Sequence, residues 1–255
     1  MSKSESIHVF DSQGEAYERA FQIFLDHTDQ KRNAKRFLQK LIGDLPNRTV
    51  FIDAGAGNGE VTKAFAGAFR HTIAVEPNPY LLTQLKQAIP QAEAVGAPIL
   101  AANPEAKGDF VLCSHVLYYI PAEEWIAHLD RLVSWMSPNG LTVVVVQNHN
   151  TDCMAMLDHF FGHRFDLHQL AHSFREKYGD RYEVVVTLDP AHVETRELAS
   201  AYAIAEFVLN TLPITRPPTR EDIEDYLTKR CLTEGTYRLS VDQDFLQIRQ
   251  RKRDV

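Results

Sequence analysis

The strongest constraint in this sequence is a regular alternation of short apolar runs with amphipathic stretches between residues 48 and 147. Short apolar runs are typical of buried strands, and the stretches between them repeat apolar residues at helical spacing. The strands are expected at residues 48–52, 72–75, 92–95, 110–114 and 141–147, and the helices at residues 61–69, 80–88 and 123–136. Strands joined through helices pair in parallel and are covered by helices on both faces. The chain is therefore expected to form an α/β fold with a doubly wound, mostly parallel sheet.

Helical segments are predicted on both sides of this alternating core. Residues 15–42 carry apolar side chains at three- and four-residue spacing, so residues 1–45 are expected to form an N-terminal helical lid. The later elements are a helix at 166–178 and strands at 182–188 and 236–248. The stretch between those strands is largely helical, so residues 190–232 are expected to form a helical substrate cap inserted before the last strand. We expect residues 1–255 to be a single domain with its core at residues 48–150.

The charge balance argues against nucleic acid as a partner. Lys and Arg total 27 and Asp and Glu total 34, so the formal net charge is −7 with histidine counted neutral. With 44% hydrophobic residues the chain is expected to be globular rather than disordered. The longest aliphatic run, residues 141–146, is far shorter than the ~20 residues of a spanning helix, and the first dozen residues are polar. We therefore expect a cytoplasmic protein whose partners include neither nucleic acid nor a membrane.

Cysteine and histidine are not spaced as metal ligands. The three cysteines, which form no C-x-x-C pair, are Cys113, Cys153 and Cys231. Histidines four residues apart occur at His159 and His163 and again at His168 and His172, but no third ligand stands at a supporting spacing. No metal site is predicted.

A glycine-rich turn follows the first predicted strand. Residues 53–60 read Asp-Ala-Gly-Ala-Gly-Asn-Gly-Glu and lead into the predicted helix at 61–69. Glycine lets the backbone turn tightly and lets a ligand approach it closely. Glu76 follows the second strand, 21 positions after Gly55, where a carboxylate can accept hydrogen bonds from both ribose hydroxyls. Together they predict an adenosine-bearing cofactor, so residues 48–150 are the expected cofactor-binding core.

The spacing of the glycines distinguishes three cofactors. A nucleoside triphosphate requires a lysine directly after the glycines, and none is present. A dinucleotide requires its third glycine at position 60, where this chain has Glu60, and the third glycine is instead Gly59. The pattern G-x-G-x-G after Asp53 resembles motif I of the class I S-adenosylmethionine-dependent methyltransferases, which implies S-adenosylmethionine as the cofactor. A glycine-rich turn without a ligand is the remaining alternative.

The resemblance extends over most of the chain to a narrower family, histamine N-methyltransferase and its relatives. It is carried by residues 17–27 (YERAFQIFLDH), by residues 75–77 (Val-Glu-Pro), by residues 116–120 and by the helix-rich region before the last strand. It implies a Rossmann-like methyltransferase fold with a seven-stranded sheet, first helices that close over the active site, and a tyrosine segment in the wall of an amine pocket. On their own, the adjacent Tyr118 and Tyr119 are more typical of core packing.

Three positions differ from that family. Gln30 stands where the family has a glutamate that contacts the substrate amine, so a charge partner is missing. Val241 stands at about the position of a family asparagine, with Asp242 and Asp244 close by. His115 replaces a glutamine, and an imidazole can hydrogen-bond a substrate or accept a proton near neutral pH.

The predicted site residues fall into three groups. Cofactor contacts are expected from Asp53, Gly55, Ala56, Gly57, Glu76, Pro77, Gly96, Ser114 and His115. Acceptor contacts are expected from Tyr17, His27, Gln30, Tyr118, Tyr119, Gln147 and Met154. The catalytic candidates are His115, as a proton acceptor, and Tyr119, whose ring face can attract a cationic sulfonium or product by ~0.5–2 kcal/mol. Met154 fits core packing equally well.

These observations predict methyl transfer from S-adenosylmethionine to a small-molecule acceptor, with an amine nitrogen favoured. The reaction is a one-step displacement, so the protein must hold nucleophile, methyl carbon and sulfur in line and exclude water. Two alternatives stay open: an O-methyltransferase acting on a small carboxylate or hydroxyl, and an S-adenosylmethionine-binding protein without catalysis. Both a monomer and a homodimer fit the sequence.

Overall fold

The chain divides into two compact units, each assembled from separate segments of the sequence. The computed structural model describes residues 6–10, 15–212, 214 and 216–251. The first unit, called the sheet unit, comprises residues 35–146, 166–188 and 244–255. The second, called the cap unit, comprises residues 1–34, 147–165 and 189–243.

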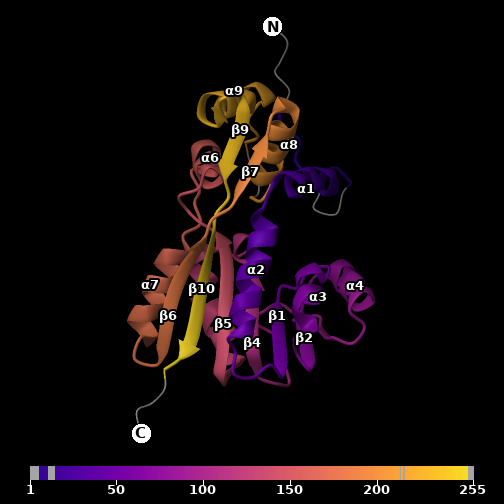
Figure 1. Cartoon of the computed structure of the whole chain (residues 1–255), viewed down its shortest axis with the longest axis vertical. Helices are drawn as coiled ribbons and strands as arrows, with labels where there is room; N and C mark the ends of the chain where they lie inside the picture. The colour runs from indigo at the N-terminus through magenta and orange to yellow at the C-terminus, as the bar shows by residue number, and fades with distance from the viewer. Residues whose placement is uncertain (1–5, 11–14, 213, 215, 252–255) are drawn as a thin grey trace. The chain divides into compact units, whose positions relative to one another are not determined.

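The sheet unit is built on a seven-stranded sheet with the order β3-β2-β1-β4-β5-β10-β6 (Figure 1). The strands are β1 Val50–Ala54, β2 His71–Val75, β3 Glu93–Val95, β4 Gly108–Ser114, β5 Met136–Gln147, β6 Tyr182–Asp189 and β10 Gln243–Gln250. Strand β1 pairs in parallel with β2 and β4, and the pairs β2–β3 and β4–β5 are also parallel. This topology confirms the predicted doubly wound α/β fold.

The central strands form the core of the sheet unit. Every residue of β1 is buried, as are residues 108–113 of β4 and 140–146 of β5. The rings of Phe51, Phe69 and Phe110 pack together with centroids 5.4 to 6.2 Å apart. Burial on both faces explains why these strands read as continuous apolar runs rather than as alternating patterns.

Two helices of the sheet unit, α4 and α7, begin at a capping side chain. They are α3 Glu60–Ala66, α4 Pro79–Ala88, α5 Trp125–Ser134 and α7 Leu167–Tyr178, with most of α2 Gln30–Gly43 and the 3-10 turns η1 Leu117–Tyr119 and η2 Ala122–Glu124. The Asn78 side chain accepts hydrogen bonds from the first backbone N–H groups of α4, and Pro79 occupies the first helical position. Asp166 caps α7 in the same way. Local side chains therefore define where α4 and α7 start.

The cap unit combines four helices with a three-stranded sheet of order β7-β9-β8. Its helices are α1 Glu15–His27, α6 Asp152–Phe161, α8 Leu198–Leu209 and α9 Arg220–Arg230, and its strands are β7 His192–Thr195, β8 Leu232–Thr233 and β9 Thr236–Ser240. The pairs β7–β9 and β8–β9 are antiparallel. The insertion at residues 190–232, expected to be helical, thus also contains strand β7 and the first residue of β8.

The predicted last strand, residues 236–248, is also divided in the structure. Its first part is β9 of the small sheet and its second part is β10 of the large sheet. Between them the chain turns at Val241, whose carbonyl accepts a hydrogen bond from Gln30 Nε2, and at Asp242, whose Oδ1 accepts one from Ala191 N. These partners are far away in sequence, so the strand-like composition of the segment does not reveal the break.

Helix α8 is the apolar centre of the cap unit. The ring of Phe207 lies 5.2 to 5.6 Å from the rings of Tyr17, Phe21 and Phe24 on α1. Although α8 is rich in apolar residues, it has only 12 residues. Among the described residues, no helix has both the length and the apolar character needed to cross a membrane.

The buried carboxylate of Asp109 connects the starts of strands β1, β4 and β5. Asp109 Oδ2 accepts hydrogen bonds from the backbone of Thr49 at 2.7 Å and Val50 at 3.2 Å, and its Oδ1 accepts one from Ser137 Oγ at 2.9 Å. We expect Asp109→Ala to lower the free energy of unfolding by about 1–3 kcal/mol, because it leaves buried donors without partners. Asp109→Asn, which keeps one acceptor oxygen, should cost less. Urea unfolding of both variants tests this, and an unchanged Asp109→Ala midpoint would contradict it.

Candidate functional site

The glycine turn between β1 and α3 requires its glycines for two different reasons. Gly55, Gly57 and Gly59 all have positive φ angles, of 77°, 57° and 87°. At Gly55 an added Cβ would also lie 2.3 Å from Cγ2 of Val116, so any side chain would collide. At Gly57 an added Cβ would meet nothing within 4 Å, so the backbone faces open space. The turn therefore exposes main chain that a ligand can approach.

Backbone hydrogen bonds attach this turn to the end of the neighbouring strand. The N–H groups of Gly55 and Ala56 both donate to the carbonyl oxygen of Val75, at 2.8 and 3.0 Å. The register pairs Ala54 with Val75, so β1 and β2 end side by side. Parallel pairing thus places the glycine turn and Glu76, the residue after Val75, together at the carboxyl ends of the strands, which form one edge of the sheet.

That following residue, Glu76, is buried and held at both carboxylate oxygens. Its Oε2 accepts a hydrogen bond from Gly57 N at 2.8 Å, and its Oε1 accepts one from Asn78 N at 2.8 Å. Each carboxylate oxygen has a second lone pair, so the group can still accept two hydroxyl donors. The carboxylate is therefore already oriented for a ribose-like diol, as its position in the sequence predicts.

Asp53 has a different environment from Glu76. It is 2% exposed, and Thr62 Oγ1 on α3 donates to its Oδ2 at 2.6 Å. Burial raises the pKa of Asp53 from an ordinary 3.8 to about 7, while the Thr62 hydrogen bond lowers it and the charge of Glu76 raises it. The hydrogen bond between Thr62 and Asp53 therefore links helix α3 to strand β1. Thr62, the hydrogen-bond donor to Asp53, was not among the predicted site residues.

The other predicted cofactor residues lie at the same edge of the sheet unit. Glu76 N donates to Val95 O, so Gly96 follows β3 next to Glu76, and Pro77 stands between Glu76 and the N-cap Asn78. Ser114 ends β4, and the next residues reach the glycine turn, because Val116 packs on Gly55. The structure therefore brings the predicted cofactor residues together around the ends of β1, β2, β3 and β4.

His115 has an unusual backbone conformation at this edge. Its φ angle is 58°, a left-handed value that non-glycine residues rarely adopt. Its N–H donates to Val145 O, and its Nδ1 lies 3.2 Å from the Tyr118 hydroxyl. Rare backbone conformations of this kind gather at functional sites. The side chain of Tyr119, in contrast, is 70% exposed.

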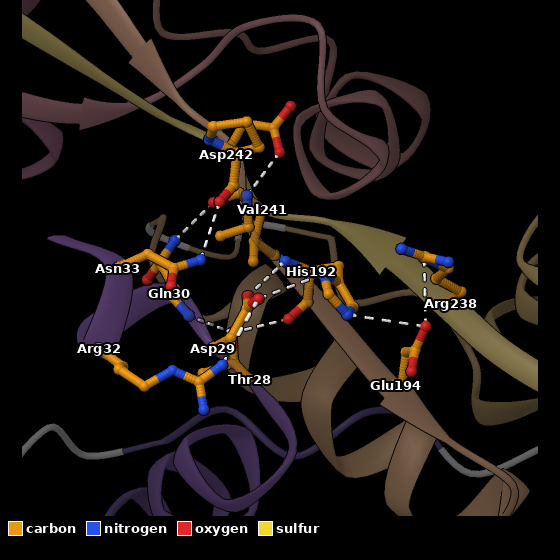
Figure 2. A network of polar contacts seen from close by, with 12 residues as sticks. Thr28, Asp29, Gln30, Arg32, Asn33, His192, Glu194, Arg238, Val241 and Asp242 are labelled. Atoms are coloured by element: carbon orange, nitrogen blue, oxygen red, sulfur yellow. Dashed lines mark hydrogen bonds and ion pairs between the residues drawn. The ribbon is translucent and has the colours of Figure 1, made fainter.

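The remaining predicted acceptor residues belong to the cap unit, where the structure gives each a local environment. Tyr17 stacks on Phe21, and His27 Nδ1 lies 2.8 Å from Ile23 O. The buried Gln30 donates to Val241 O at 2.8 Å (Figure 2). Met154 is 2% exposed, and Gln147 Nε2 donates to Thr151 Oγ1. Their contact with an acceptor stays a prediction, and the environments of Gln30 and Met154 are those of structural residues.

The chain is similar in sequence to one described protein family. Residues 25–194 match the family model described as "Methyltransferase domain". No curated protein sequence matches the chain significantly.

Several solved structures share the fold at low sequence identity. A putative methyltransferase from Bacillus halodurans C-125 has a TM-score of 0.58 and 12% identity, covering 94% of this chain and 100% of its own. The N-methyltransferase NodS from Bradyrhizobium japonicum WM9, in complex with S-adenosyl-L-homocysteine, has a TM-score of 0.55 and 12% identity, covering 94% and 100%. Magnesium protoporphyrin IX methyltransferase from Synechocystis PCC 6803, with bound S-adenosylmethionine, has a TM-score of 0.50 and 13% identity, covering 95% and 87%.

The raised pKa of Asp53 predicts a pH-dependent loss of stability. Below the unfolded-state pKa of 3.8, Asp53 is protonated in both states. As pH rises, the unfolded state loses this proton first and the folded state keeps it until about pH 7, so the free energy of unfolding falls across that window. Asp53→Asn has no such proton. The variant should therefore gain stability relative to the original protein between about pH 5 and about pH 8, by more than about 1 kcal/mol.

Urea unfolding of both proteins at the two pH values measures this difference. Asp158→Asn, which removes a carboxylate from an exposed ion pair with Arg164, is the control for the loss of one acidic residue. The prediction is wrong if the difference in unfolding free energy between the two proteins is the same at both pH values. That result would show that Asp53 is ionised in the folded state.

Proposed function

The chain belongs to the family of methyltransferase domains, and from this premise we propose that it transfers a methyl group from S-adenosylmethionine to an amine nitrogen of a small molecule. The observation that carries the proposal is the buried Glu76 carboxylate, bonded to Gly57 N across an open glycine turn. This arrangement suits an adenosine, because the carboxylate can accept hydrogen bonds from the ribose hydroxyls and the glycine main chain leaves room for the rest of the cofactor.

The residues present fit S-adenosylmethionine better than the other adenosine cofactors. Glu60, where a dinucleotide loop has its third glycine, is here the first residue of α3. No lysine directly follows the glycines, as a phosphate-binding loop requires, and the turn is bonded or adjacent to the acidic Glu76 and Asp53. An uncharged ribose and a sulfonium cation are compatible with that acidic surrounding, whereas a chain of phosphates is not.

The proposed reaction is a single displacement. When bound, S-adenosylmethionine supplies an electrophilic methyl group whose bond to sulfur breaks as the nitrogen lone pair attacks, leaving the electron pair on sulfur. The chain's own residues have to orient the acceptor, exclude water and remove a proton from the amine.

His115 and Tyr119 are the proposed residues for these tasks. The imidazole of His115, whose Nδ1 lies 3.2 Å from the Tyr118 hydroxyl, is the proposed group that takes a proton from the acceptor. The exposed ring of Tyr119 offers a face to a cationic amine or product. The amine preference is supported by these two side chains and by the resemblance of residues 17–27 and 116–120 to the histamine N-methyltransferase family.

Glu76 variants test the cofactor site directly. We expect Glu76→Ala to weaken S-adenosylhomocysteine binding by about 1–3 kcal/mol, because it removes a charged acceptor, and Glu76→Gln to weaken it less. Glu93→Gln, on the neighbouring strand β3, is the matched control and should bind normally. Titration calorimetry measures all three proteins. Tight NAD binding without any response to S-adenosylhomocysteine would reject the cofactor assignment.

Turnover with amines tests the acceptor assignment. A panel of amines, amino acids, phenols and carboxylic acids, assayed for release of S-adenosylhomocysteine, should give the highest rates with amines. For the best substrate, His115→Asn and Tyr119→Leu should lower kcat by about tenfold or more and should lower cofactor affinity much less, because both side chains are proposed to act on the acceptor. Tyr119→Phe keeps the ring and should retain most activity. Unchanged turnover in both His115→Asn and Tyr119→Leu would place the acceptor elsewhere.

A further inference from the structure

The cap unit contains a pocket of its own, formed apart from the residues that make the glycine turn. The pocket has a volume of about 510 Å³ and all of its lining residues belong to the cap unit. That volume is in the range of small-molecule sites. Its charged and titratable lining residues are Asp29, Asp152, His192, Arg230, Arg238 and Asp242.

The small sheet brings several of these side chains to one face. In the β7–β9 pairing His192 is opposite Ser240 and Glu194 is opposite Arg238, and residues opposite each other in an antiparallel pair point to the same side. Figure 2 shows His192 between Asp29 and Glu194, with Arg238 on the other side of Glu194. Of this row, the sheet contributes His192, Arg238 and Ser240 to the pocket lining, while Glu194 pairs with Arg238 outside the lining.

The acidic side chains of the pocket are held by backbone donors. Asp29 Oδ1 accepts from His192 N and Asp242 Oδ1 accepts from Ala191 N, each at 2.9 Å. Asp152 Oδ2 accepts from both N and Oγ of Ser240, at 2.8 and 2.7 Å. Within the described part of the chain, no donor reaches Asp242 Oδ2 or Asp152 Oδ1. All three carboxylates are therefore fixed in place. Asp152 and Asp242 each keep an acceptor oxygen for a ligand, whereas Asp29 Oδ2 lies 3.4 Å from His192 Nδ1 and 4.0 Å from Arg32.

The basic side of the pocket includes an arginine available for a ligand. Arg230 is the last residue of α9 and is exposed, and no carboxylate of the residues that the structure describes lies within 4.0 Å of it. Arg238 is 3.3 Å from Glu194 Oε1. A guanidinium has five donors in a fixed fork that matches a carboxylate, so Arg230 can bind one at two points.

Two other uses of these residues fit less well. In the described residues the pocket carboxylates do not bring three ligand atoms within 4.8 Å of one another, so they do not form a metal site. Burial, with a smaller contribution from the charge of Asp152, raises the pKa of Cys231 to about 12. The thiol that lines the pocket is therefore neutral and is not a nucleophile.

From the fixed carboxylates of Asp29, Asp152 and Asp242 and the Arg230 side chain in the same lining, we propose that the cap pocket binds a small zwitterion, namely a free amino acid. The acidic side chains receive the ammonium group and Arg230 receives the carboxylate. A simple anion would meet three aspartates, and a simple cation would leave Arg230 without a partner. The zwitterion is the ligand class that satisfies both sides.

Calorimetry on the full chain without cofactor tests this site independently of methyl transfer. The twenty common amino acids are titrated as free compounds, and each binder is then compared with its N-acetyl and methyl ester derivatives. We expect at least one free amino acid to bind, and both derivatives to bind about tenfold more weakly or worse, because each lacks one charge. Binding by no free amino acid, or equal binding of a derivative, would overturn the proposal.

Variants connect the binding to the named residues. Arg230→Gln and Asp242→Asn, the latter keeping Oδ1 for Ala191 N, should each weaken binding by about tenfold or more. Lys229→Gln is the matched control, since Lys229 stands next to Arg230 but pairs with Asp225 and does not line the pocket. Each variant is also titrated with S-adenosylhomocysteine, which should bind as before. Normal amino-acid binding by both Arg230→Gln and Asp242→Asn would show that the pocket is not the site.

Discussion

The hydrogen bonds accepted by the Glu76 carboxylate connect the parts on which the candidate cofactor site depends. One oxygen holds Gly57 in the turn after β1, and the other holds Asn78, whose side chain caps α4 after β2. Hydrogen bonds to a charged group are each worth about 1.5–3 kcal/mol, so the turn and the helix start are joined firmly. The site is thereby organised before a cofactor binds, and its residues need little rearrangement to receive one.

The same edge of the sheet also contains conformations and charges that are unfavourable by themselves. Asp53 is buried near Glu76, so its pKa is raised to about 7, and only Thr62 compensates for part of the cost. His115 has a φ angle of 58° directly after β4. Such costs concentrate where a protein acts, because the surrounding structure must hold groups in place for a ligand. Their coincidence at the ends of β1 and β4 supports the location of the site.

The two units offer different chemistry to ligands. In the sheet unit, the candidate site consists of backbone N–H groups, bare glycine and one carboxylate, which suits a ribose and a sulfonium. In the cap unit, the pocket is lined by charged side chains of both signs, which suits a zwitterion. The first depends on strand pairing, and the second depends on side chains from α6 and α9 and from the residues that directly precede α2 and β10. The two proposals can therefore fail independently.

The sequence alone determined the sheet unit well. Helix and strand periodicities are local, so the parallel sheet was predicted correctly. The spacing of Gly55, Gly57, Gly59 and Glu76 selected residues that the structure brings together at the ends of β1 and β2. The glycine spacing also favoured S-adenosylmethionine over NAD, in agreement with the methyltransferase-domain family. These signals lie within a few residues of one another or repeat regularly, so no knowledge of distant contacts is needed to read them.

The cap unit was decided only by tertiary contacts. Strand β7 has four residues and β8 has two, too few for a period of two to be recognised, and β7 pairs with β9 more than 40 residues later. The break between β9 and β10 depends on Gln30 and Ala191, and Gln30 itself, expected to face an acceptor, bonds to the Val241 carbonyl. Local patterns contain no information about such partners. Hydrogen bonds between segments distant in sequence form the small sheet and its pocket, and only the folded chain shows which segments meet.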